Sequence, residues 1–377
     1  MSRVTKPEVL LRAATRADIG ELVNIEATCF QTDKLSRRSF LNLVRPGPHD
    51  LIVVADGQRI LGYVLNLYRH GTNLARMYSI AVLPEAQGRG LAGKLMEAAE
   101  AAAIARHCVF IRLEVNVGNK PALALYEKRH YRRIGRIRGY YEDGADANRM
   151  EKHLNLPGAG SKAAKPYYEQ TTDFTCGPAS LMMAMKTLDP KYRFSRTEEL
   201  QIWREATTIF MTSGHGGCSP HGLALSAWQR GFSVSLYINY AEAPFIDGVR
   251  DDEKKAVIEL VHEDFLARID KTRIRLNVQE MDGAQLDAII GNGDPVIALI
   301  STWRLNRNKA PHWVYVTGID DEFIYINDPD QETDPHLTEM DYIHVPVTRP
   351  MFQGMARFGR KRLRCLLVLH GLRKKRN

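Results

Sequence analysis

The chain has 377 residues, a length that predicts two or three domains, each able to bury a core. Hydrophobic residues make up 44% and charged residues 25%, which is typical of an ordinary globular protein. The sequence has no run of 18 apolar residues, and its N-terminus lacks the apolar core of a signal peptide, so neither a membrane span nor secretion is expected. The five cysteines are scattered and never form Cys-x-x-Cys. That pattern favours a reducing cytoplasm and argues against disulfides or a thiolate zinc site.

The net charge of +8 is unevenly distributed along the chain. Residues 1–156 hold 24 Lys/Arg and 16 Asp/Glu, which amounts to the whole net charge. Residues 157–356 are about −9, whereas residues 357–377 hold nine basic and no acidic side chains. The first segment therefore suits an acidic or RNA-associated partner, such as the ribosome. The basic C-terminal tail, which includes a strand expected at 363–369, suits solubility, subunit docking or an RNA contact.

Three local patterns predict the first elements of the chain. Residues 9–12 are strand-like, and an amphipathic helix follows that ends near Cys29. The apolar runs 51–55 and 60–65 flank Asp56-Gly57, which predicts a hairpin.

A glycine-rich turn follows the apolar run 77–83 and precedes a helix rich in Ala and Leu. Residues 87–92 fit the pattern Q/R-x-x-G-x-G/A. Glycine lets the backbone approach a bound group closely, and the free amides of the new helix point at that group. The sequence therefore predicts a nest that holds a pyrophosphate without a lysine or a metal. A plain tight loop is the alternative.

A second block, residues 113–126, carries a carboxylate and a phenol. An ammonium must lose a proton before it attacks a thioester, and the carboxylate of Glu114 can accept that proton. The departing thiolate needs a proton, which the phenol of Tyr126 can supply. The alternatives are a salt-bridged strand residue at Glu114 and a core tyrosine at Tyr126.

The two blocks resemble the GNAT acetyltransferases, and most of all the bacterial enzymes that acetylate the N-terminal alanine of a ribosomal protein. The resemblance covers roughly residues 9–154. It implies acetyl-CoA as cofactor, a protein or peptide amine as acceptor, Glu114 as general base and Tyr126 as general acid. It also implies that the loop 138–141 helps to form the acceptor site. The implied cofactor contacts are Ile80, Ala81, Val82, Gln87, Gly88, Arg89, Gly90, Leu91, Ala92 and Asn119.

Residues 156–166 are rich in small residues and bracketed by prolines, which predicts a linker. The sequence thus predicts one domain over 1–155 and another over 167–377.

The second half contains a cysteine, a histidine and an aspartate in the chain order of a papain-like catalytic triad, with a glutamine before the cysteine. Cys176 opens a predicted helix, whose dipole favours a thiolate, and Gln170 lies six residues earlier, where its amide could serve an oxyanion. His312 opens one predicted strand and Asp328 ends the next, so an antiparallel pair would bring them together. Cys176, His312 and Asp328 thus follow the order nucleophile, base and orienting group. A plain core cysteine is the alternative at Cys176.

This half resembles the papain-like peptidases that trim double-glycine leaders at bacteriocin exporters, and more closely the stand-alone peptidase-like domains fused to GNAT modules in bacteria. The resemblance covers about residues 165–346 and rests on Gln170, Cys176, His312 and Asp328. Thr175 stands where the exporter enzymes carry an acidic residue. The implied fold class is α+β in two domains, a GNAT mixed sheet followed by a papain-like fold.

Cys218, flanked by His215 and His221, suggests a metal site or a rival nucleophile. Ser219-Pro220 is better explained as a helix start, so no metal is expected. The sequence therefore predicts a bifunctional enzyme, an acetyltransferase joined to a cysteine peptidase. The alternative is an acetyltransferase whose second half is a non-catalytic peptide-binding module. The oligomeric state stays open.

Overall fold

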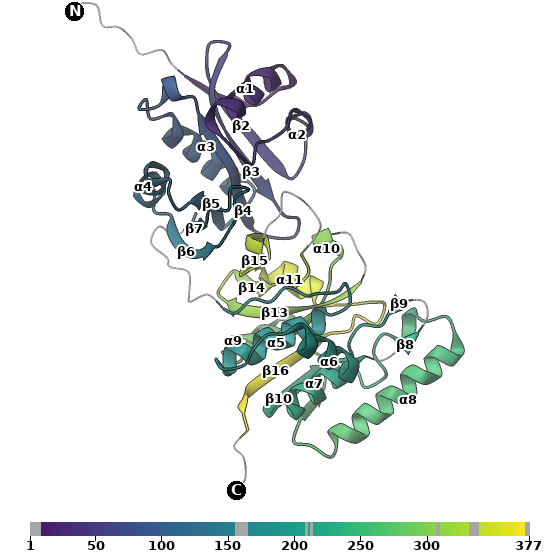
Figure 1. Ribbon diagram of the computed structural model, residues 1–377. Helices are drawn as coiled ribbons and strands as arrows, with labels where there is room; N and C mark the ends of the chain where they lie inside the picture. The colour runs from purple at the N-terminus through teal and green to yellow at the C-terminus, as the bar shows by residue number, and fades with distance from the viewer. Residues whose placement is uncertain are drawn as a thin grey trace, which may run out of the picture. The chain divides into compact units, whose positions relative to one another are not determined.

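A computed structural model describes residues 9–154, 165–207, 210–211, 214–306, 310–331 and 339–373 (Figure 1). The chain divides into two compact units, Met1–Ala163 and Ala164–Asn377. The predicted linker at 156–166 lies outside the described residues except for its last two positions. Each unit contains its own seven-stranded mixed sheet with helices packed on it, so both are α+β structures, as the sequence predicts.

The first unit is organised around one sheet in the order β1-β2-β3-β4-β5-β7-β6. Its strands are β1 (Leu10–Ala13), β2 (His49–Asp56), β3 (Arg59–Tyr68), β4 (Leu74–Val82), β5 (Phe110–Asn116), β6 (Arg132–Ile137) and β7 (Ala147–His153). Its helices are α1 (Ile19–Cys29), α2 (Arg37–Leu43), α3 (Leu91–Ala105) and α4 (Lys120–Lys128).

The parallel neighbours β4 and β5 separate soon after they meet. They pair only over residues 74–76 and 110–112. Beyond that point β4 continues along β3 as far as Val82, and β5 continues along β7 as far as Asn116. The side of β4 that faces β5 is therefore left without a strand partner from Met77 onward. Such an edge can bond an extended partner through backbone N–H and C=O groups.

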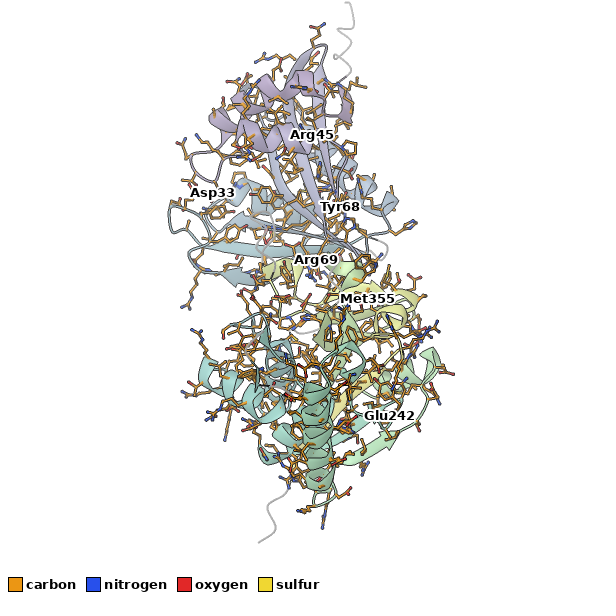
Figure 2. The ribbon with its side chains drawn as sticks, turned by 90° about the vertical axis from the view of Figure 1, so that its right-hand side faces the viewer. Asp33, Arg45, Tyr68, Arg69, Glu242 and Met355 are labelled. Atoms are coloured by element: carbon orange, nitrogen blue, oxygen red, sulfur yellow. The ribbon has the colours of Figure 1, made fainter. Side chains whose placement is uncertain are left out.

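The predicted hairpin is present, because Asp56 pairs with Arg59 and Gly57 has a φ of 63°. Tyr68 lies at the far end of β3 (Figure 2). It donates a hydrogen bond of 2.7 Å to Asp50. Arg106, at the end of α3, lies over the Tyr68 ring at 4.5 Å. These contacts hold α3, the helix that follows the glycine-rich turn, against β2 and β3.

The second unit is built on a sheet in the order β11-β10-β16-β12-β13-β14-β15. Its strands are β8 (Phe210–Met211), β9 (Gly214–His215), β10 (Phe232–Ile238), β11 (Arg275–Val278), β12 (Val296–Ser301), β13 (Pro311–Ile319), β14 (Phe323–Asn327), β15 (Val345–Thr348) and β16 (Cys365–Leu372). Its helices are α5 (Cys176–Leu188), α6 (Arg196–Ala206), α7 (Pro220–Gln229), α8 (Asp252–Ile269), α9 (Gly283–Gly291), α10 (Trp303–Asn306) and α11 (Arg349–Met355).

This sheet is covered on both faces (Figure 1). Helices α5, α6 and α7 pack on one face around Trp313 and Leu367, and α9 and α11 pack on the other around Val314 and Val368. Successive residues of one strand thus enter opposite cores, as the alternation of a β-strand requires. The strands in the middle of the sheet are accordingly almost entirely apolar.

The basic tail of the sequence contains a core strand. β16 lies between β10 and β12, and residues 365–369 are buried. Its basic neighbours Arg364 and Arg373 flank that apolar run. The expected strand at 363–369 is therefore present, and only residues 374–377 of the tail lie outside the described residues.

Candidate functional site

The glycine-rich turn has the backbone geometry that its sequence predicts. Gly88 and Gly90 both have a φ of 76°, and Gly90 is the N-cap of α3. No heavy atom lies within 4 Å of where a Cβ would stand at either glycine. Glycine is needed here for the left-handed backbone, and the space in front of the turn is open.

The amides of this turn are free to bind an anion. Within the described residues, no backbone carbonyl accepts a hydrogen bond from Gly88, Arg89 or Gly90. The first amides of α3, at Leu91 and Ala92, have no partner inside the helix by construction. Together they form a nest at the positive end of a helix dipole.

The side chains of the turn contact neighbouring residues of the first unit and so are not directed at a ligand. Gln87 donates a hydrogen bond of 3.3 Å to the carbonyl of Val82, and Arg89 lies 3.4 Å from Asp56. Among the predicted cofactor contacts, the backbone amides of this nest are those assigned to the pyrophosphate, and the edge of β4 at residues 80–82 is that assigned to the pantetheine arm. Asn119 instead caps α4, where its side-chain oxygen accepts from Ala122 at 3.2 Å.

Glu114 forms a buried ion pair. Its Oε2 lies 3.0 Å from both Nε and one Nη of Arg76, and both side chains are less than 5% exposed. Arg76 also donates a hydrogen bond of 3.0 Å to the hydroxyl of Tyr140, in the predicted acceptor loop. Glu114 is therefore a salt-bridged strand residue that also lies beside the acceptor loop.

Tyr126 lies in α4, and its ring packs 5.8 Å from that of Tyr131. Burial raises the pKa of Tyr126 to about 12. Its hydroxyl makes no hydrogen bond to any residue that the structure describes. Burial, and then the charges of Glu114 and Tyr126, raise the pKa of Tyr141.

A further carboxyl group near β4 was not predicted. Glu26 accepts hydrogen bonds from the Tyr63 hydroxyl and from the amide of Leu35, the latter at 2.9 Å. Tyr63 in turn lies 2.7 Å from Ser79 of β4. Burial raises the pKa of Glu26. No sequence pattern identifies this series of hydrogen bonds, because it depends on how α1 packs across β3 and β4.

In the second unit, Cys176 is the first residue of α5, as predicted. The loop before it is held by Glu199, which is fully buried. Glu199 accepts from the amide of Thr171 at 2.8 Å and from the hydroxyl of Thr175 at 2.5 Å. No sequence pattern points to Glu199, because it is one polar residue of a helix that begins twenty residues after the cysteine.

His312 and Asp328 are brought together as predicted. The Nε2 of His312 lies 2.7 Å from Oδ1 of Asp328, and both side chains are buried. Burial alone lowers the pKa of His312, but the charges of Asp328 and Cys176 outweigh it and leave the pKa well above its usual value.

Gln170 is near this group but its amide is engaged. Its Nε2 donates a hydrogen bond of 2.9 Å to Asp330, and its backbone amide donates to Pro329 at 2.9 Å. Its Oε1 is buried and has no partner among the described residues. Asp330 also donates from its backbone amide to Asp328 at 3.1 Å. Sequence analysis missed Asp330.

A small apolar cavity of about 160 Å³ opens beside Cys176. Phe245 and Val249 line it from one direction, and Pro311 and Trp313 from another. It has room for one aliphatic side chain.

The rival nucleophile Cys218 is only 3% exposed, and burial raises its pKa far above the usual value. His221 packs against His262, with ring centroids 4.8 Å apart. The side chain of His215 lies outside the described residues. Within the described part of the chain, no cluster of three or more His, Cys, Asp or Glu could hold a metal.

Family models match residues 19–131 to the Acetyltransferase (GNAT) family and residues 165–370, more than half of the chain, to the Peptidase_C39 like family. An N-alpha-acetyltransferase from Saccharolobus solfataricus is 30% identical over 155 residues, covering 38% of this chain and 92% of that protein. The chain belongs to both families. A Bacillus subtilis protein, provisionally named a ribosomal protein bS18-alanine N-acetyltransferase, is 31% identical and covers 40% of this chain and 99% of its own length.

The solved structure of the ribosomal-protein-S18-alanine N-acetyltransferase from Escherichia coli is 22% identical, with a TM-score of 0.36, covering 41% of this chain and 99% of that one. The predicted fold class is confirmed for the GNAT sheet and for a second, mixed-sheet α+β unit. The first unit is an N-acetyltransferase, and acetyl-CoA is the cofactor of its family. None of the described helices is long and apolar enough to cross a membrane.

Proposed function

We propose that the chain is a bifunctional cytoplasmic enzyme, which acetylates the α-amino group of a protein or peptide and also cleaves an acyl bond through Cys176. All five cysteines are unpaired thiols, which suits a reducing compartment. The curated relatives named above act on protein α-amines by name, which supports a protein or peptide acceptor. The basic first segment supports an acidic or ribosome-associated partner.

The acetyltransferase proposal rests on the unpaired edge of β4 next to the glycine nest. Acetyl-CoA supplies the acetyl thioester. The backbone of residues 80–82 would bind the pantetheine arm, and the amides of residues 88–92 would bind the pyrophosphate. Tyr126 would protonate the departing sulfur, because its high pKa keeps the proton on the phenol at neutral pH. Glu114 would accept the proton of the attacking ammonium, with Arg76 fixing its position.

Cofactor binding is tested by calorimetry on the full chain with a chelator present. We expect Gly90→Ala to weaken acetyl-CoA affinity at least tenfold, because alanine disfavours the φ of 76° that aims the amides. Gly57→Ala is the matched control, since Gly57 also has a positive φ and open space around it but lies in the β2–β3 turn. An equal loss of affinity in both variants would contradict the nest.

The peptidase proposal rests on the hydrogen bond of 2.7 Å between His312 and Asp328, and on the charge of Cys176, which acts on the same imidazole. Cys176 sulfur would attack the scissile carbonyl and form an acyl-enzyme. His312 would donate its proton to the departing amine. A water molecule would then give a proton to His312, attack the thioester of the acyl-enzyme, and release the carboxylic acid and the Cys176 sulfur. Asp328 would hold the ring, and a Gln170 N–H would bind the oxyanion.

A non-catalytic peptide-binding module is the alternative, and an acyl substrate distinguishes the two. We expect the full chain to hydrolyse p-nitrophenyl acetate, and Cys176→Ala to abolish that turnover. The Cys218→Ala variant controls for the loss of a nearby thiol. If the parent and Cys176→Ala released nitrophenol at the same rate, the module would be the better description.

A further inference from the structure

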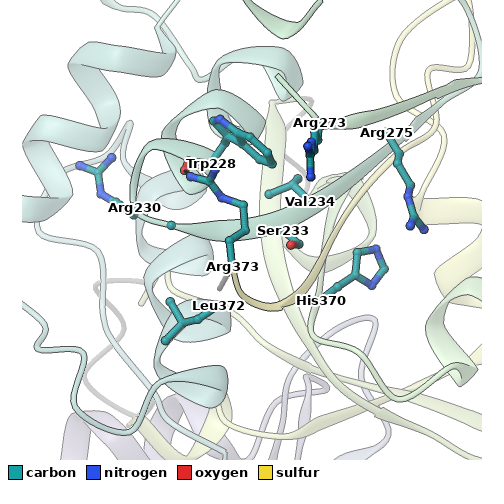
Figure 3. Close-up of a pocket in the computed structure, with 10 residues that line it drawn as sticks. Trp228, Arg230, Ser233, Val234, Arg273, Arg275, His370, Leu372 and Arg373 are labelled. Carbon is teal, nitrogen blue, oxygen red and sulfur yellow. Dashed lines mark hydrogen bonds between the residues drawn. The ribbon is translucent and has the colours of Figure 1, made fainter. Parts of the chain in front are cut away.

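A wide groove of about 1310 Å³ lies at one end of the second unit's sheet, where β10 begins and β16 ends (Figure 3). It lies far from the proposed catalytic group. Leu372, in the groove, pairs with Phe232, whereas Cys365 at the other end of β16 pairs with Ile238. The strand spans about 23 Å between those two positions, at 3.3 Å per residue. His312 pairs with Ile300 near the Cys365 end, so the groove is a separate site.

Most of the positive charge in this groove is uncompensated. Arg230 points away from the others in Figure 3 and is neutralised by Glu198 and Glu205, each at 2.6 Å. In contrast, Arg273 and Arg275 are exposed and have no carboxylate partner among the described residues.

Arg373 is also unpaired with any described carboxylate. Its guanidinium lies 3.6 Å from the centre of the Trp228 ring and donates a hydrogen bond of 2.6 Å to the Trp228 carbonyl. Three guanidinium groups without a described carboxylate partner thus share one groove, although residues 157–377 as a whole carry a net charge of about zero. The positive charge is therefore concentrated in the groove and does not reflect the net charge of the second unit.

The groove combines these charges with flat and apolar surfaces. Arg273 and Arg275 both line it at the start of β11, and two residues of chain can separate their Cα atoms by at most about 7 Å. That spacing is of the same order as the distance between successive phosphates of a nucleic acid strand. The stacked pair of Arg373 and Trp228 offers a plane, and Leu372, which is 55% exposed, offers apolar area. Unpaired bases stack on such planes, whereas the carboxylate groups of an acidic peptide offer no aromatic face.

We propose that this groove binds single-stranded RNA, with phosphates on Arg273 and Arg275 and a base against Arg373, Trp228 and Leu372. Guanidinium groups bind phosphate in a bidentate manner, which suits the two arginines. The groove's volume also exceeds the roughly 300–1,000 Å³ of an ordinary small-molecule pocket. This site is independent of either proposed catalytic activity.

The test is fluorescence anisotropy of the full chain with a labelled 15-nucleotide oligouridine in about 0.1 M salt. The groove variant is Arg273→Glu with Arg275→Glu, and the matched control is Arg357→Glu with Arg360→Glu. All four arginines are exposed in the same unit, the charge change is identical, and the control pair lies beyond the other end of β16. Residues 374–377 stay unchanged in every variant.

We expect the groove variant to bind at least tenfold more weakly and the control variant to stay within twofold of the parent. The slope of log K against log salt should fall by about 1.4 in the groove variant, since each lost phosphate contact removes about 0.7 for single strands. Unlabelled oligouridine should displace the probe at a concentration at least tenfold lower than oligoglutamate of equal length. Equal weakening in both variants, or equal competition by oligoglutamate, would overturn the proposal.

Discussion

The side-chain amide of Gln170 donates a hydrogen bond of 2.9 Å to Asp330, two residues beyond the aspartate that holds His312. The ionised carboxylate can only accept, so it fixes the nitrogen end of the amide toward Asp330. One N–H is used in this way, and the second stays free to meet an oxyanion. Asp330 thus has a positioning role within the proposed site.

Gln170→Ala should lower the rate of p-nitrophenyl acetate acylation by about 10²-fold, the usual effect of losing one oxyanion donor. Asp330→Asn should lower it less, because the amide can then turn over toward the new side chain. Alkylation by iodoacetamide forms no oxyanion and should proceed at the parental rate in both variants. A parallel loss in both reactions would show that the substitutions disturb Cys176 itself.

The thiols should differ widely in reactivity. Burial raises the pKa of Cys108 to about 12, and that of Cys218 and Cys365 well above the ordinary value. The pKa of Cys29 is also raised, first by burial and then by Glu26 and Glu85. Since only the thiolate alkylates, we expect iodoacetamide at pH 7 to label Cys176 at least tenfold faster than any other cysteine, as measured by peptide mass spectrometry. Faster labelling of another thiol would argue against Cys176 as the nucleophile.

His221 should make the second unit sensitive to acid. Burial, and then the charge of His262, lower its pKa to about 3. The neutral ring is therefore the folded form, so its contribution to stability is present above about pH 6.5 and is lost as the pH falls toward 3. Between pH 6.5 and 5 this loss is about 2 kcal/mol.

Urea unfolding at pH 7 and pH 5 measures this effect. The parent should lose more stability than His221→Gln over that interval, because glutamine cannot titrate. Equal losses in the two proteins would mean that other groups account for the acid sensitivity.

Glu114 and Glu151 allow a comparison of two buried ion pairs that each have one member on β5. Arg112 lies 2.7 Å from Glu151, and these side chains are as buried as Arg76 and Glu114. Either Glu114→Gln or Glu151→Gln removes the charge of one carboxylate from a buried arginine, at a cost of about 3–5 kcal/mol. If Glu114 is the base, its variant should lose at least a further 10²-fold in turnover at a temperature where both variants are folded. Equal turnover in the two variants would leave Glu114 with a structural role alone.

Tyr126→Phe should lower acetyl transfer by about 10²- to 10⁴-fold with little change in acetyl-CoA affinity. The substitution removes a proton donor and almost no buried surface. With a pKa of about 12, the phenol keeps its proton through mild alkali, so parental turnover should show no loss from this group below pH 10. Turnover within twofold of the parent would mean that another group protonates the sulfur.

Much of the site could be predicted because it depends on short-range pattern. His312 lies on β13 and Asp328 directly follows β14, and these strands pair as neighbours in the chain, so their meeting follows from one hairpin. The turn at residues 87–92 and the helix start at Cys176 are equally local. In each case the residues that meet are separated by a single turn.

The partners that sequence analysis missed depend on register between distant strands and helices. Arg76 of β4 lies opposite Arg112 of β5, and that register brings Arg76 against Glu114, 38 residues later. Glu199 reaches the loop before Cys176 only because α6 packs beside α5. No periodicity in the sequence reports which buried carboxylate meets which donor.

The central place of β16 has a consequence for the order of synthesis. A ribosome delivers β10, β12, β13 and β14 long before residues 365–372 emerge, and until then β10 and β12 have no strand to join them. The nascent second unit must therefore carry two half-sheets with open apolar edges until its last strand is made. The first unit, whose last strand ends at His153, can complete its sheet more than two hundred residues earlier. A stop codon just before Cys365 should accordingly yield a chain with a folded first unit and an aggregation-prone remainder.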